Sequence, residues 1–337
     1  MPILFLGDLF YDYDYITQDI LKISDYIKKN EYKVILNLEG SITDSSSLKI
    51  KKRGEHLCQS KEVVSVLKML NVKGVILSNN HIFDYLEHGV KDTIEILEKN
   101  NIPYTGIVKS KEHCPSSIFI QDGKQEYEIF AATDPYEESL CRSDKMGCSL
   151  IKDLMNDSLV SSTKTKKIAF LHTGFEYNTL PTKRTIKECR QLIDHGFECV
   201  ICSHPHIVQP YEIYKDKFIF YSIGNFYFSS FREEFHNKII KQKPKHYCDL
   251  GYGIVFDKCN VHIIGIDYNT NNLTPILSEN FEAEELNFTN NTNYKKEYYN
   301  NRNNHNFFLT GNKIMDAGKM YMLNIIYKIY RKVKHLD

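Results

Sequence analysis

The chain has 337 residues, enough to bury a sizeable apolar core as one large α/β domain or as two smaller domains. Lysine plus arginine and aspartate plus glutamate both number 43, so no global field draws the whole molecule towards nucleic acid or an anionic membrane. Nine cysteines, an odd number without regular spacing, favour reduced thiols in a cytoplasmic protein over a disulfide framework.

Short apolar runs alternate along the chain with stretches of helical period, which predicts an α/β fold. The candidate strands are Ile3–Leu6, Val34–Leu36, Val75–Leu77, Ile168–Leu171, Val200–Ile201 and Phe218–Ser222. The candidate helices are Ile20–Ile27, Val63–Leu70, Val90–Leu97 and Thr185–His195, and alternation predicts hairpin strands over Ile118–Phe130 and Gly253–Leu277. The first run is too short for a signal peptide and no run of ~18 apolar residues follows, so we expect a chain that is neither exported nor membrane-spanning.

The composition changes after Glu285 to an Asn- and Tyr-rich stretch that cannot bury enough apolar surface to order itself. We therefore expect a core domain at 1–285, a connector at 286–312 and a basic amphipathic helix at 313–337. The apolar side of that helix is formed by Met322, Ile325, Ile326, Ile329 and Val333. Basic residues lie around its other side, so we expect peripheral contact with the inner membrane face, or packing on the core or a partner chain.

Polar residues follow five of the predicted strands directly. They are Asp8 after the first strand, Glu39 after the second, Asn80 and His81 after the third, His172 after the fourth, and His204 and His206 after the fifth. Ligand sites of parallel sheets form outside the carboxyl ends of the strands, so we expect these side chains to converge in one crevice.

This mixture of carboxylate, amide and imidazole suits one or two divalent ions such as Mn, Zn, Fe or Co, whereas Ca or Mg sites hold fewer imidazoles. Two ions ~3.5–4 Å apart could bind a phosphoryl or acyl oxygen and supply hydroxide at neutral pH. Glu39 is the natural candidate for a bridging carboxylate, and His81 for a general acid.

Each position also has a plainer interpretation when it is taken alone. Asp8 could cap the following turn, Asn80 and His81 could belong to a turn with left-handed backbone angles, and His172 could be a core histidine with satisfied hydrogen bonds. The His-Pro-His sequence at 204–206 is harder to explain in this way. The joint occurrence at successive strand ends favours a metal site.

An ordered series of motifs runs along the chain to about residue 280. It comprises Gly7-Asp8, Asn37-Leu38-Glu39-Gly40, Asn79-Asn80-His81, His172-Thr173-Gly174, His204-Pro205-His206 and Tyr221-Ser222-Ile223-Gly224-Asn225-Phe226. The series resembles the bacterial capsule-synthesis proteins of the CapA or poly-γ-glutamate biosynthesis family, whose fold is similar to that of calcineurin-like metallophosphoesterases. The resemblance implies a β-sandwich flanked by helices in four layers, α/β/β/α, with metal ligands at the strand ends and His81 facing the substrate.

The chain also departs from the pattern of related metallophosphoesterases. Where they have Asp-x-His at the first strand, this chain has Asp8-Leu9-Phe10, so one imidazole of one metal position is missing. Cys202 and Ser203 stand where the family commonly has Gly-His, and we expect them to tune the pocket only. Asp84 and Glu176, each near an expected ligand, could orient an imidazole or contact substrate, although a helix cap or surface turn explains Asp84 equally well.

These features predict a metal-dependent hydrolase, specifically a phosphoesterase, that acts in the assembly of a capsule or another cell-surface polymer. Its substrate would be a phosphorylated or polymer-precursor molecule, and its partners capsule-assembly proteins in the cytoplasm or at the membrane face. The alternative is a non-hydrolytic accessory or ligase component of poly-γ-glutamate or capsule biosynthesis. The neutral net charge and the lack of a basic, aromatic-interleaved stripe argue against a nucleic-acid phosphodiesterase.

Overall fold

The computed structural model describes most of the first 278 residues. The described ranges are 1–44, 48–52, 55–109, 115–135, 146–156, 159, 165–229, 231–235, 238–242, 250–258, 260–269 and 274–278. The chain divides into two compact units, Met1–Thr289 and Asn290–Asp337. The predicted connector at 286–312 and amphipathic helix at 313–337 lie outside the described residues, so the three-segment organisation stays a prediction.

The first large sheet has, within the described residues, eight strands in the order β20-β19-β18-β1-β2-β5-β6, with β15 also pairing with β1. The strands are β1 (Ile3–Phe10), β2 (Lys33–Leu38), β5 (Val72–Ile76), β6 (Tyr104–Thr105), β15 (Asn225–Phe228), β18 (Leu250–Asp257), β19 (Asn260–Asn269) and β20 (Thr274–Ser278). Strands β1, β2, β5 and β6 run parallel, so the carboxyl ends of β1 and β2 reach the same edge.

The second large sheet has the order β13-β14-β12-β11-β9-β8 among the described residues. Its strands are β8 (Ser117–Asp122), β9 (Gln125–Thr133), β11 (Lys166–His172), β12 (Cys199–Ser203), β13 (Val208–Tyr214) and β14 (Lys217–Ile223). Two-stranded pairs are formed by β3 (Ser41–Ile42) with β4 (Cys58–Gln59), β7 (Ile107–Val108) with β10 (Gly147–Cys148), and β16 (Phe231–Phe235) with β17 (Lys238–Gln242).

Helical segments connect the parallel strands and carry one apolar side each. They are α1 (Gln18–Lys29), α2 (Val63–Met69), α3 (Leu86–Lys99), α4 (Lys183–Asp194) and the 3-10 helix η2 (Ile151–Met155). Helix α1 begins where the Thr17 hydroxyl accepts the backbone N–H of Ile20, and α4 where Thr182 accepts that of Thr185 at 2.9 Å. The four predicted helices are confirmed as α1, α2, α3 and α4.

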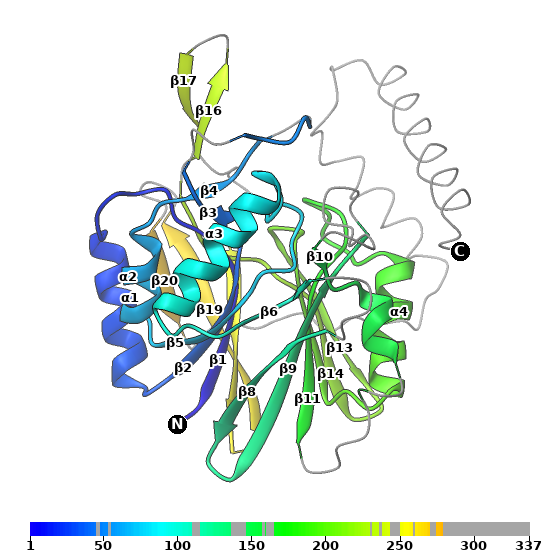
Figure 1. Ribbon diagram of the computed structural model, residues 1–337. Coiled ribbons are helices and arrows are strands. Elements are labelled where there is room, and N and C mark those ends of the chain that lie inside the picture. The colour runs from blue at the N-terminus through cyan, green and yellow to red at the C-terminus, as the bar shows by residue number, and fades with distance from the viewer. Residues whose placement is uncertain are drawn as a thin grey trace, which may run out of the picture. The chain divides into compact units, whose positions relative to one another are not determined.

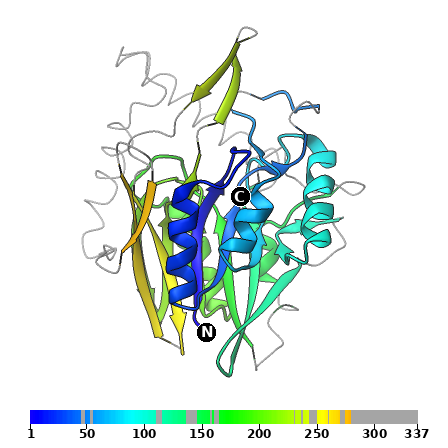
Figure 2. The same ribbon diagram turned by 90° about the vertical axis from the view of Figure 1, so that its left-hand side faces the viewer.

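The fold has four layers because each large sheet buries both faces. Alternate residues of β1 point to opposite cores: Ile3 and Phe5 pack between the two sheets, while Leu4 and Leu6 pack under α1, α2 and α3. Helix α4 lies against β12 and β14 on the outer face of the second sheet. Figure 1 shows α1 and α2 on one side of the paired sheets and α4 on the other, and Figure 2 shows α1 and α2 across the face of the first sheet. The expected α/β/β/α sandwich is confirmed.

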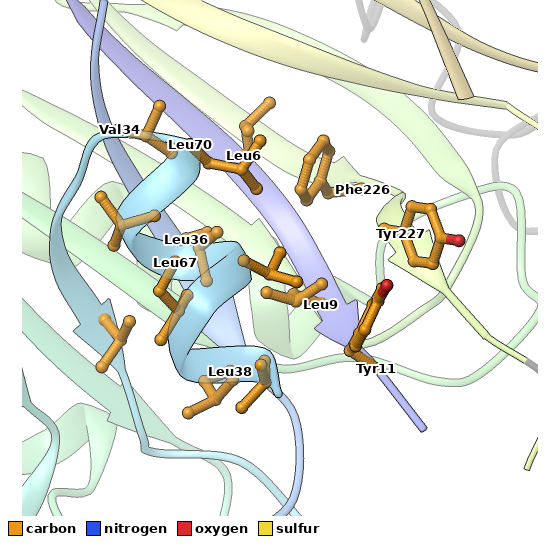
Figure 3. Packing of buried hydrophobic residues seen from close by; sticks show 14 of the residues in the cluster. Leu6, Leu9, Tyr11, Val34, Leu36, Leu38, Leu67, Leu70, Phe226 and Tyr227 are labelled. Atoms are coloured by element: carbon orange, nitrogen blue, oxygen red, sulfur yellow. The ribbon is translucent and has the colours of Figure 1, made fainter. Parts of the chain in front are cut away.

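The core under the helices holds the strands that carry the polar residues at their ends. Figure 3 shows Leu67 beside Leu36 of β2, and Leu9 of β1 in the same cluster. All three side chains are fully buried, and burying one leucine stabilises the fold by about 1.5–3 kcal/mol. The ends of β1 and β2 are thus fixed by packing on one face of the sheet.

Strand β1 continues four residues beyond the predicted end at Leu6, because it goes on pairing with β2 and with the start of β15. Its register with β2 shifts between Leu6 and Asp8. A Cβ atom on Gly7 would lie 1.9 Å from the carbonyl oxygen of Gly224, so only glycine allows the two backbones to approach this closely. This close approach places Asp8 against the second sheet.

Replacing Gly7 by alanine should therefore lower the free energy of unfolding by about 3 kcal/mol, since backbone must move to admit the methyl group. Gly123→Ala is the control, because its Cβ would meet nothing within 4 Å and the cost comes from its positive φ alone, about 1 kcal/mol. Urea denaturation followed by circular dichroism measures both. Equal midpoints for the two variants would contradict the close-approach account.

Candidate metal centre

Asp8 lies at the irregular end of β1, fully buried between the two sheets. Its Oδ1 accepts a hydrogen bond from Asn37 Nδ2 at 2.8 Å, and its Oδ2 accepts the backbone N–H of His204 at 3.4 Å. The Oδ2 atom also lies 3.4 Å from His206 Nδ1. The carboxylate thus joins β1 and β2 of the first sheet to the loop after β12 of the second.

Glu39 follows β2 and is completely buried. Neither of its carboxylate oxygens has a hydrogen-bond partner in the described part of the chain. Its backbone carbonyl is well satisfied, since Gln59 Nε2 donates to it at 2.6 Å. A buried carboxylate without a hydrogen bond is costly to the fold, so a bound cation would suit this one.

One ligand atom from each of Asp8, Glu39 and His206 lies within 4.8 Å of the others, and the side chains of all three are buried. Nε2 of His206 is 3.6 Å from Glu39 Oε1. The backbone supports this convergence: His204 and His206 have φ values of 102° and 59°, in the left-handed region that non-glycine residues seldom adopt. Such strained angles are typical of functional sites.

A second group lies beside the first and consists of Asn80, His172 and His204. Nε2 of His172 is 2.8 Å from Asn80 Oδ1 and 3.1 Å from His204 Nδ1. Its other nitrogen, Nδ1, lies 3.2 Å from Ser203 Oγ, which fixes the ring. Neighbouring ligand atoms about 2.1 Å from one ion are separated by about 3.0–3.4 Å. The 3.1 Å separation lies in this range and the 2.8 Å separation just below it, and all three donors are of types that bind divalent ions.

The ionisable side chains of the first group shift one another's pKa values. Burial, and then the negative charge of Asp8, raise the pKa of Glu39 well above its ordinary value. Burial alone would raise the pKa of Asp8 too, but the hydrogen bond and charge of His206 outweigh it and hold that pKa below its usual range. Against the effect of burial, Glu39 and Asp8 raise the pKa of His206 to about 10. The carboxylate pair thus retains a cationic partner even in the protein alone.

The imidazoles of the second group are neutral. Burial, followed by the proximity of His204, lowers the pKa of His172 well below its ordinary value. Burial lowers the pKa of His204 to about 4. Neutral imidazole is the form that binds metal ions, so these two side chains are ready ligands at neutral pH.

His81 lies at the edge of the cluster, with its Nε2 atom 4.0 Å from Glu39 Oε1. Its Nδ1 atom is 2.8 Å from Asp84 Oδ2, and Lys52 Nζ lies 3.1 Å from the same nitrogen and pairs with Asp84. Burial alone would raise the pKa of Asp84, but His81 and Lys52 outweigh it and lower that pKa. Glu176 is exposed; its charge contributes to the raised pKa of His206 and opposes the lowering of the His204 pKa by burial. The contact of Asp84 with His81 Nδ1 is the one that a group orienting this imidazole would make.

All nine residues singled out in the sequence therefore lie in or around one cluster. Sequence reasoning gave no role to Asn37, Asn79, Asn225 and Lys52. Asn79 donates to the Leu38 carbonyl at 2.9 Å and accepts the N–H of His81 at 3.1 Å, so it ties the third loop to the second. Asn37 and Asn225 were visible within the quoted motifs, whereas the sequence held no signal for Lys52.

A model of the bacterial capsule synthesis protein PGA_cap family matches residues 4–230. The chain belongs to this family. It is 26% identical to the capsule biosynthesis protein CapA of Bacillus anthracis over 230 residues, which is 65% of this chain and 54% of that protein. It is 28% identical to the PGA biosynthesis protein CapA of Bacillus subtilis over 217 residues, 63% of this chain and 55% of that protein. The chain spans about half the length of the curated relatives it matches.

Among solved structures, a 5'-nucleotidase from Candida albicans SC5314 aligns with a TM-score of 0.49 and 10% identity, covering 81% of this chain and 52% of that one.

Within the described residues, no helix is long and apolar enough to cross a membrane.

Glu39→Gln should be more stable than the wild type without metal and should gain less stability than the wild type when metal is added. The folded-state pKa of Glu39 is raised, so its charge destabilises the metal-free fold once the pH rises above the carboxyl's ordinary value. With a chelator at pH 7 the variant should melt at a higher temperature than the wild type, and the difference should shrink as the pH falls towards 4. Mn²⁺ at about 100 times its Kd should stabilise the wild type by about 2.7 kcal/mol and the variant far less.

Calorimetric melting curves with and without Mn²⁺ measure these effects. Glu87→Gln, which changes a carboxylate on α3 paired with Lys91, is the control and should behave like the wild type. Equal Mn²⁺ stabilisation of wild type and Glu39→Gln would remove Glu39 from the metal site.

Proposed function

We propose that this protein is a metal-dependent hydrolase of phosphoesters that serves the assembly of a capsule or another cell-surface polymer. The observation that carries the proposal is the fully buried Glu39 carboxylate, without a hydrogen-bond partner among the described residues and set between Asp8 and His206. Membership of the capsule synthesis family supports the biological setting.

Asp8, Glu39 and His206 would hold one divalent ion, and Asn80, His172 and His204 a second. A Mn, Zn, Fe or Co ion bound there would polarise a phosphoryl oxygen and lower the pKa of a water molecule. The protein's own part is to fix the donors: Ser203 orients His172, and Asn37 orients Asp8.

His81 is placed to act as the general acid. Because Asp84 accepts the Nδ1 hydrogen, the Nε2 atom is the one that faces the cluster and could donate a proton to a departing oxygen. Lys52 shares Asp84 with His81 and holds the carboxylate in place. The exposed Glu176 borders the same site and would contact substrate or tune the imidazoles.

The substrate we propose is a phosphorylated precursor of the surface polymer, and the partners are other capsule-assembly proteins. The names of the two relatives, a capsule and a PGA biosynthesis protein, support this class. We place the reaction in the cytoplasm, with residues 313–337 as the peripheral contact to the inner membrane face. The core domain at 1–285 would carry the chemistry.

A non-hydrolytic role as an accessory or ligase component of poly-γ-glutamate or capsule biosynthesis is the second candidate. Phe10 favours it, because this residue stands where related metallophosphoesterases have an imidazole. Wild-type protein without turnover on any phosphoester or phosphoanhydride, in the presence of Mn, Zn, Fe or Co, would favour this candidate over the hydrolase.

His81→Ala should keep its bound metal and lose about 10²–10⁴-fold in kcat on alkyl phosphoesters, because a positioned acid contributes that much to the rate. The kcat on an activated aryl ester, whose leaving group needs no proton, should fall much less. His195→Ala, which removes an imidazole hydrogen-bonded to Gln191 at the end of α4, should leave both rates unchanged. Steady-state assays on the two substrate types measure the ratio, and equal losses on both would exclude a general-acid role.

A further inference from the structure

Asn225, the first residue of β15, reaches the same cluster as the expected ligands. Its side chain is 2% exposed, and its Oδ1 atom is 2.9 Å from His206 Nδ1. That nitrogen lies 3.4 Å from Asp8 Oδ2. Asp8 and Asn225 are register partners in the parallel pairing of β1 with β15, so the two side chains leave neighbouring strands at the same level.

Glycines near Asn225 allow the backbone to bring this residue next to Asp8. Gly224 has φ 69°, which lets the chain turn from β14 into β15. A Cβ on Gly251 would lie 2.2 Å from the carbonyl oxygen of Asn225, just as one on Gly7 would meet Gly224. Glycines on β1 and β18 thus admit the start of β15 to the centre of the first sheet.

Each of the two groups of donors contains an amide oxygen beside an imidazole once Asn225 is included. In one, the amide oxygen of Asn80 lies beside an imidazole nitrogen of His172. In the other, the amide oxygen of Asn225 lies beside an imidazole nitrogen of His206, with 2.9 Å between the two atoms.

Residue 10 supplies no donor to this group. The Phe10 ring packs against that of Phe228 at 5.3 Å, and Phe228 packs edge-on against His206 at 5.3 Å. Phe228 therefore occupies one side of the His206 ring with Phe10 packed behind it, and an additional donor must come from another strand. β15 is the strand paired at the level of Asp8.

We propose that Asn225 Oδ1 is a direct ligand of the ion held by Asp8, Glu39 and His206, in place of the imidazole that residue 10 does not provide. This inference rests on the metal dependence in the proposed function. A lesser role, in which Asn225 only accepts a hydrogen bond from His206 Nδ1, is the alternative that the experiment must separate.

The experiment is a calorimetric titration of the metal-free full-length protein with Mn²⁺, with metal content measured after gel filtration and folding checked by circular dichroism. Wild type should bind two ions per chain. Asn225→Ala should bind one tightly, because the group that loses its amide oxygen loses a direct ligand, whereas the Asn80 group is untouched. Asn225→Asp preserves an oxygen at this place and should bind two.

The matched control is Asn37→Ala, which removes the hydrogen bond to Asp8 Oδ1 without removing a ligand. Loss of such a supporting contact typically costs 10–100-fold in affinity, so this variant should still bind two ions, more weakly. If Asn225→Ala also binds two ions with a loss of that size, or Asn225→Asp binds one, Asn225 is not a ligand. Wild type that binds no Mn²⁺ would instead overturn the metal dependence on which the inference rests.

Discussion

The burial of the Glu39 carboxylate at the junction of two sheets is the constraint on which the rest of the site depends. Both of its oxygens are enclosed without a hydrogen-bond partner among the described residues, and burial raises its pKa well above the ordinary value. A fold gains nothing from such a group unless a cation compensates it. Asp8 and His206 each place a ligand atom within 4.8 Å of one on Glu39, so the three side chains could share such a cation.

The sandwich explains how donors so distant in sequence meet. Strands β1 and β2 deliver Asp8 and Glu39 from the first sheet, while β11 and β12 deliver His172 and the His-Pro-His turn from the second. The apolar core between the sheets holds them face to face, and the Gly7–Gly224 approach brings β1 close to the strand that follows β14. Packing thus supplies the preorganisation that metal binding would otherwise have to create.

Local sequence patterns predicted β1, β2, β5, β11, β12 and β14, the hairpin strands, the four helices and the polar residues at the strand ends, because parallel strands between two apolar cores leave continuous runs such as Ile3–Leu6. They did not predict β6, β13, β15 or the short two-stranded pairs. The layer order came from the resemblance to a family. Patterns failed where pairing between distant strands decides the outcome: the extension of β1 to Phe10 depends on β15, more than 200 residues later. Asn225 was not predicted as a donor for the same reason, because the sequence around it does not indicate that it pairs with Asp8.

The central claim is that Asp8, Glu39 and His206 bind a divalent metal ion, and the most direct test is a crystal structure of the protein soaked with Mn²⁺, with anomalous scattering recorded to locate the ion. The account predicts an anomalous peak within about 2.0–2.3 Å of a Glu39 oxygen and in contact with Asp8 and His206. Peaks only at surface carboxylates, with the Glu39 side chain hydrogen-bonded to protein groups, would contradict it.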